Sequence, residues 1–132
     1  MNKLRAKISD IKSVENLNIV NFDFNQQTLS MVSLDLDDEI EIDTAVELSA
    51  KSTHIAIAKE FTGELSYSNQ IKATIVEIDY GQLLTSVKAD VNGVLLESII
   101  TSNSANRMGL KNNDEVILLI KATELFISKV LK

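Results

Sequence analysis

The sequence predicts an all-β protein made of two tandem small barrels, each with five strands and at most a short helix. Three observations predict this fold. Apolar and polar residues alternate with a period near two, Asn92-Gly93 is a signal for a tight turn between two strands, and the chain repeats its own pattern. About five short strands per repeat fit a small Greek-key barrel of the oligonucleotide/oligosaccharide-binding (OB) type.

Two blocks of sequence occur twice in the same order. Residues 2–11 align with residues 69–78 at an offset of 69 − 2 = 67, where Asn, Ala and two Ile match in place. Residues 46–53 align with residues 116–123 at an offset of 121 − 51 = 70, so the second copy carries a three-residue insertion between the blocks. The ordered recurrence of both blocks indicates an internal duplication.

The duplication predicts a first domain at residues 1–61 and a second at residues 65–132. A barrel of roughly 65 residues buries too little surface to be comfortably stable alone. Two copies packed together, or several chains packed together, would supply the missing core. We therefore expect a homo-oligomer.

Individual elements follow from local patterns. Strict alternation predicts strands around Val20 in the first copy and Val87 in the second, and Asn92-Gly93 is a signal for a tight turn between two strands. The apolar run 116–120 is typical of a fully buried strand. Residues 102–110 predict a short helix, with Ser102 or Ser104 as the N-cap and Gly109 near the end.

Composition excludes several functions. The 132 residues are 45% apolar and contain no cysteine, so neither disorder nor thiolate chemistry is expected. No run approaches the roughly 20 apolar residues of a membrane span, and the N-terminus lacks a signal-peptide core, which predicts a cytoplasmic protein without membrane contact. A net charge of −6 argues against binding nucleic acid.

Six acidic residues fall within residues 35–43. Such a run is usually a solvated loop or face. The alternative is a site for a hard cation, but the spacing lacks the glycine and the terminal glutamate of a helix-loop-helix calcium site.

Four segments in order resemble the motifs of the molybdenum-binding Mop (TOBE) domains, and the tandem resembles the two-domain molbindins. They are the opening segment 66–70, the Ile-Thr-x-x-Ser loop 100–104, the Gly-Leu-Lys segment 108–116, in which Asn113 replaces a glycine, and the Lys-Ala-Thr segment 120–125. The resemblance covers the whole second copy. It implies that molybdate or tungstate is bound between neighbouring domains of an oligomer, a trimer in this family, with no organic cofactor and no directly coordinated metal.

The resemblance also implies which residues contact the oxyanion. In the second copy they are Ser66, Ser68, Thr101, Ser104, Lys121 and Ala122, and the lysine motif recurs in the first copy as Lys51 and Ser52. The chemistry is appropriate, because a fully ionised oxyanion only accepts hydrogen bonds and needs hydroxyl, backbone N–H and cationic donors. Residues at the start of the predicted helix would offer free N–H groups.

Structural interpretations stay open beside these. A lysine at a strand end is often a solvated charge, and Ser102 and Ser104 could simply cap a helix. Two departures from the family pattern also weaken the expected site: Ser68 stands where the family has arginine, and Asp35 falls in the first copy's counterpart of the Thr/Ser loop.

Catalysis is not expected. The single histidine, His54, is predicted on a strand through residues 55–57, and no serine or acidic residue can be tied to it as a triad. No glycine-rich phosphate loop is present. The sequence thus predicts molybdate or tungstate binding for intracellular storage, buffering or sensing. The alternative is a non-catalytic oligomerisation or regulatory module that contacts a protein partner, with anion binding weakened or lost.

Overall fold

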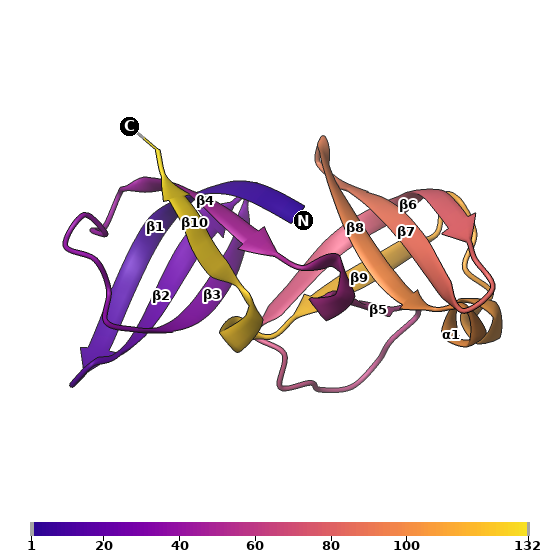
Figure 1. Cartoon of the computed structure of the whole chain (residues 1–132), viewed down its shortest axis with the longest axis horizontal. Helices are drawn as coiled ribbons and strands as arrows, with labels where there is room; N and C mark the ends of the chain where they lie inside the picture. The colour runs from indigo at the N-terminus through magenta and orange to yellow at the C-terminus, as the bar shows by residue number, and fades with distance from the viewer. Residues whose placement is uncertain (1, 132) are drawn as a thin grey trace.

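The computed structural model describes residues 2–131 and shows ten strands in two five-stranded antiparallel sheets, one at each end of the molecule (Figure 1). The first sheet has the strand order β10-β4-β1-β2-β3. Its members are β1 (Asn2–Val14), β2 (Leu17–Phe24), β3 (Gln27–Leu34), β4 (Ala45–Ala50) and β10 (Phe126–Val130). The all-β class predicted from the sequence is confirmed.

The second sheet repeats this arrangement in the order β5-β9-β6-β7-β8. Its members are β5 (Ala56–Ala58), β6 (Asn69–Tyr80), β7 (Leu84–Val91), β8 (Val94–Thr101) and β9 (Glu115–Ile120). Short helical segments join the strands: the 3-10 turn η1 (Ser52–His54), the helix α1 (Ser102–Met108) and the 3-10 turn η2 (Ala122–Glu124).

The last strand of each sequence copy lies in the sheet of the other copy. Strand β5 pairs with β9, where Ile57 lies opposite Leu118, and β10 pairs with β4, where Ile127 lies opposite Leu48. In Figure 1 the yellow C-terminal strand accordingly lies on the indigo and purple sheet. The two sheets are therefore mosaics of the copies predicted at residues 1–61 and 65–132.

Strands whose sequences alternate bury one face. In β1 the residues from Asn2 to Ser9 alternate between buried and exposed, and Val87 and its alternate neighbours in β7 are buried. The core of the first sheet centres on Phe22 and Phe24, which are 0% and 1% exposed. Burial of such aromatic side chains stabilises the fold by roughly 1.5–3 kcal/mol each.

The predicted turn and helix are present, but the helix cap differs from the prediction. Asn92 and Gly93 join β7 to β8 with φ angles of 50° and 93°, as a tight hairpin requires. Helix α1 begins at Ser102, and Thr101 is its N-cap instead of Ser102 or Ser104, because Thr101 is still extended and its side chain accepts the Ser104 N–H. Gly109 ends the helix with a φ of 59°.

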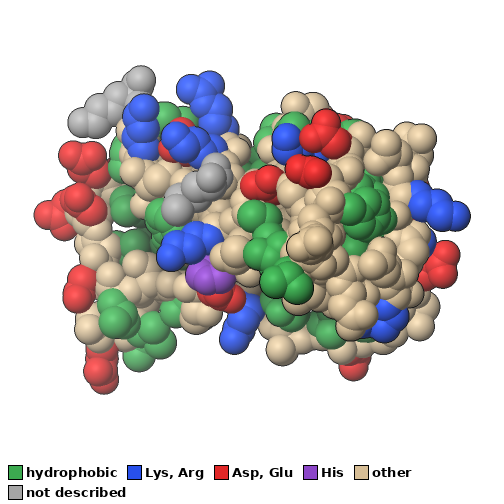
Figure 2. Space-filling model, turned by 45° about the vertical axis from the view of Figure 1, so that its right-hand side comes forward, with side chains coloured by type: hydrophobic (Ala, Val, Ile, Leu, Met, Phe, Trp, Pro, Cys, Tyr) green, Lys and Arg blue, Asp and Glu red, His purple; other side chains and the backbone are tan. Residues whose placement is uncertain are grey.

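The acidic run is a solvated loop. The acidic residues between positions 35 and 43 are all exposed. Acidic side chains project from the end of the molecule that holds the first sheet (Figure 2). Among residues 2–131 no group of three or more His, Cys, Asp or Glu is placed to hold a metal ion, which goes against the cation-site alternative. The same part of the chain contains no helix of the length and apolarity needed to cross a membrane.

Two buried asparagines join the sheets at equivalent positions of the repeat. Asn2 accepts the N–H of Glu97 (2.6 Å) and donates to its carbonyl (2.9 Å). Asn69 accepts the N–H of Ser30 (2.7 Å) and donates to its carbonyl (3.0 Å). The partners are related by the repeat offset, since 30 + 67 = 97. Each asparagine thus pairs with the backbone of an outer strand in the opposite sheet.

We predict that Asn69→Ala destabilises the protein by about 2–4 kcal/mol, because it leaves the N–H and the carbonyl of the half-buried Ser30 without their side-chain partner. Urea unfolding of the intact chain would measure this loss. Asn112→Ala, in an exposed turn, is the matched control and should leave the midpoint unchanged. Equal midpoints for the two variants would contradict a clamping role for Asn69.

An ion pair ties the segment after β5 to the loop before β9. The Lys59 ammonium lies 3.0 Å from a carboxylate oxygen of Asp114 and also donates to the carbonyl of Gly109 at the end of α1. The hydrogen bond from Lys59, followed by that from the Lys111 N–H, lowers the pKa of Asp114 below its usual value. The contact thus stabilises the folded state only while Asp114 is ionised.

Lys59→Met should therefore lower stability at neutral pH. Because the folded-state pKa of Asp114 lies below its unfolded value of about 3.9, the stabilisation is present above that value and is lost as the pH falls through the folded pKa. The stability difference between wild type and variant should shrink in the same acidic range. Unfolding curves at a series of pH values would show this, with Lys12→Met, an exposed lysine on β1, as the control.

Candidate functional site

The predicted Thr/Ser loop places two hydroxyl groups side by side at the start of α1. The Thr101 hydroxyl donates to the Ser104 hydroxyl (2.9 Å) and accepts the Ser104 N–H (3.2 Å). The Arg107 guanidinium, one helical turn further on, also donates to the Ser104 oxygen (3.4 Å). Among residues 2–131 the Ser104 hydroxyl accepts hydrogen bonds but donates none. Its O–H group is therefore available to donate a hydrogen bond to an anion.

These hydroxyls line a hollow of about 490 Å³ to which separate segments of the chain contribute. The opening segment contributes Tyr67 and η2 contributes Glu124. The other lining residues come from η1 and β5, from β7, and from the end of β8 and the start of α1: Thr53, His54, Ile55, Ala56, Leu84, Ile99, Ile100, Thr101 and Ser104. The hollow is thus formed where the repeated motifs of both copies converge.

His54 and Glu124 link the two 3-10 turns across this hollow. The His54 Nδ1 lies 3.0 Å from a carboxylate oxygen of Glu124. The sequence predicted His54 on a strand, but it lies in η1, and the strand begins only at Ala56, because residues 51–55 cross from one sheet to the other. The Glu124 carboxylate opposes an anion in the hollow, and a protonated His54 would offset its charge.

The other predicted contacts of the second copy flank the hollow without lining it. Ser66 and Ser68 are exposed on either side of Tyr67. Lys121 is exposed and Ala122 half-buried, and they precede Glu124 in η2. The structure of one chain therefore brings Thr101 and Ser104 into contact and does not bring the remaining four into the hollow.

Of the residues predicted in the first copy's lysine motif, Ser52 lies in a different hollow and Lys51 lines neither. Lys51 is exposed, whereas Ser52 is buried and lines a separate hollow of about 310 Å³ with Asn2, Lys88 and Glu97. The Ser52 hydroxyl donates to a carboxylate oxygen of Glu97 (2.8 Å). This hydroxyl is therefore already engaged by an anion of the protein itself.

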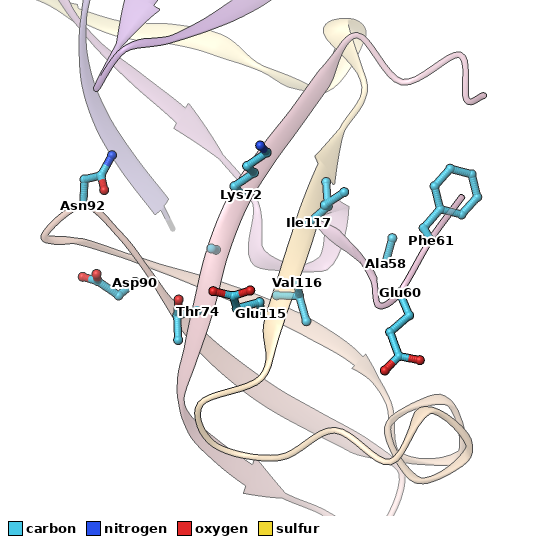
Figure 3. A pocket seen from close by; sticks show the side chains of 11 residues that line it. Ala58, Glu60, Phe61, Lys72, Thr74, Asp90, Asn92, Glu115, Val116 and Ile117 are labelled. Carbon is cyan, nitrogen blue, oxygen red and sulfur yellow. The ribbon is translucent and has the colours of Figure 1, made fainter. Parts of the chain in front are cut away.

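A larger hollow of about 590 Å³ contains none of the predicted contacts (Figure 3). It lies over β6 and β9, where Lys72 is accompanied by three carboxylates, Glu60, Asp90 and Glu115. Because acidic groups outnumber the one cation among its lining residues, its electrostatics disfavour an anion.

Sequence reasoning missed Arg107 and Thr53. Arg107 follows Ser104 by three residues, and residues at i and i+3 share one face of a helix, so the predicted helix carried this signal. Thr53 belongs to the repeated Lys-x-Thr motif, but its approach to Thr101 depends on the crossing between sheets. Arg107 supplies near Ser104 the guanidinium that is absent at Ser68.

The comparisons with known proteins concern the domain type and the fold. The TOBE domain model matches residues 65–127. This part of the chain is a TOBE domain. The resemblance predicted from the sequence is confirmed there, and the TOBE domain contains α1, Thr101, Ser104 and Arg107.

The whole chain shares its fold with a solved protein. A crystal structure of the cytoplasmic molybdate-binding protein ModG, in a form with molybdate bound, superposes with a TM-score of 0.89. The match covers 96% of this chain and 94% of that protein at 20% sequence identity. No curated protein matches the chain by sequence. The fold of the TOBE domain and of the segment before it is therefore that of ModG.

Thr101 has a capping role that can be separated from ligand binding. Thr101→Val removes the acceptor of the Ser104 N–H and should destabilise the protein by about 1 kcal/mol, whereas Thr101→Ser keeps the cap and should stay near wild type. Thermal unfolding would measure both variants. A loss in Thr101→Ser with none in Thr101→Val would show that the threonine methyl, and not the cap, matters.

Proposed function

We propose that this protein binds molybdate or tungstate for intracellular storage, buffering or sensing, and that it does so without catalysis. The observation that supports this most is a TOBE domain whose hydroxyl pair lines a hollow, within a fold shared over 96% of the chain with a molybdate-binding protein. The ligand would be an intact oxyanion held by hydrogen bonds, with no organic cofactor.

The chemistry of the hollow suits an oxyanion in part. The Ser104 hydroxyl has a proton to donate, and Arg107 adds a positive charge beside it. Hydrogen bonds to a charged partner contribute roughly 1.5–3 kcal/mol each. The Glu124 carboxylate works against binding, although one of its oxygens is in contact with the His54 Nδ1.

We propose that a neighbouring chain completes the site. Ser66, Ser68 and Lys121 are exposed and Ala122 is half-buried, and none of the four lines the hollow in one chain, so a second copy could bring such donors toward the hydroxyl pair. This corresponds to the family resemblance, in which the oxyanion is bound between domains of a trimer. We further propose that each mosaic sheet closes as an OB-like Greek-key barrel and that the domains divide near residues 61–65.

Calorimetric titration with molybdate, tungstate, sulfate and phosphate tests this proposal. We expect the first two to bind and Ser104→Ala and Arg107→Gln each to weaken binding by about ten- to a hundredfold, the cost of one hydrogen bond to a charged group. Asn103→Ala, exposed on the same helix, is the matched control and should bind like wild type. Absence of heat with all four anions would refute the proposal.

A second function is favoured by one observation. Large apolar side chains are exposed at the outer hairpin ends of both sheets, with Val14 at 74%, Leu34 at 61% and Leu83 at 82% exposure. Such surfaces suit contact with another protein chain. A stable oligomer that is indifferent to every anion would favour an oligomerisation or regulatory module over a binding protein.

A further inference from the structure

The two lysine motifs meet the opposite sheet at β8 and β3, and the residues at the repeat-related positions 97 and 30 of these strands differ. Asn2 pairs with the backbone of residue 97 next to η1, and Asn69 pairs with the backbone of residue 30 next to η2. At position 30 the residue is serine, whose hydroxyl donates to the Asn21 side chain (2.7 Å). At position 97 it is glutamate, whose carboxylate accepts the Ser52 hydroxyl of the first copy's motif.

The Glu97 carboxylate is held by hydroxyl donors in the way a bound oxyanion would be. One oxygen accepts the Ser86 hydroxyl (2.6 Å) and the other accepts the Ser52 hydroxyl (2.8 Å). These two donations, that from Ser86 first, hold the pKa of Glu97 below its usual range, so the group stays anionic at neutral pH. Ser52 is thus satisfied by an internal anion.

The space around this carboxylate could hold a small ion. The hollow there has a volume of about 310 Å³ and is lined by Asn2, Ser52, Leu95, Leu96, Glu97 and the cationic Lys88. One water occupies about 30 Å³ of liquid, so the space is not limiting. Without the carboxylate, two hydroxyl donors and one ammonium would face it.

We infer that Glu97 occupies the oxyanion position of the first copy's Lys51–Ser52 motif and thereby prevents a second molybdate from binding there. The inference rests on the proposed function and assigns its stoichiometry: the chain binds the oxyanion through its second copy, and Glu97 acts as a built-in competitor at the first. A serine at position 97, as at position 30, opens the first copy's site.

Glu97→Ser and Glu97→Ala test this directly. Both keep the Asn2 clamp, since that clamp uses only the backbone of residue 97. In calorimetric titration of the full chain with molybdate, we expect each variant to bind one more ion per chain than wild type. Glu115→Gln removes the same charge from an exposed position and should not add a site. The double variant Ser52→Ala/Glu97→Ser should return to the wild-type number.

The two hypotheses fail differently in this experiment. Wild-type stoichiometry in Glu97→Ser and Glu97→Ala overturns the role of Glu97, whether or not the wild type binds. A wild type that binds nothing while Glu97→Ser binds one ion overturns the proposed function of the natural chain and supports the role of Glu97. An extra ion in Glu115→Gln as well would attribute the gain to net charge and overturn the inference.

Discussion

The exchange of the last strand between the two copies is the constraint on which the rest of the structure depends. Without β10 the first sheet would end at β4, and without β5 the second would end at β9, each with an unpaired edge. The buried Asn2 and Asn69 join the exchanged halves, because each pairs with the backbone of a strand in the opposite sheet. The exchanged strands and these hydrogen bonds therefore tie the two sheets together.

This crossing also determines where the chemistry lies. The segment between the fourth and fifth strand of each copy must leave one sheet and enter the other, and the repeated Lys-x-Thr motif occupies that segment in both copies. The two 3-10 turns consequently meet between the halves, where His54 contacts Glu124. The candidate site is a product of topology: Thr53 reaches the hollow of Thr101 only because its strand continues into the opposite sheet.

Most of the fold could be predicted because strand alternation and turn residues act locally. The pattern around Val87, the Asn92-Gly93 turn and the helix end at Gly109 all depend on neighbours within a few residues. The exchange of β5 and β10 could not be predicted, because the repeat fixes strand order within a copy but not which sheet receives the fifth strand. The hydrogen bond of the Ser52 hydroxyl depends on the same exchange. The family resemblance predicts that it contacts a ligand, but it donates to Glu97, which is 45 residues away in the sequence.

The strand exchange gives the duplication a particular meaning. Two single-copy chains that traded their last strands would form a symmetric dimer, in which every contact between the chains would occur twice with the same pair of residues. Joining them through the segment that leads from β5 to β6 makes the encounter intramolecular, with an effective concentration set by the tether. Joining the two copies in one chain also allows their sequences to differ. A homodimer must place the same residue at both clamps, whereas the fused chain places serine at one and glutamate at the other.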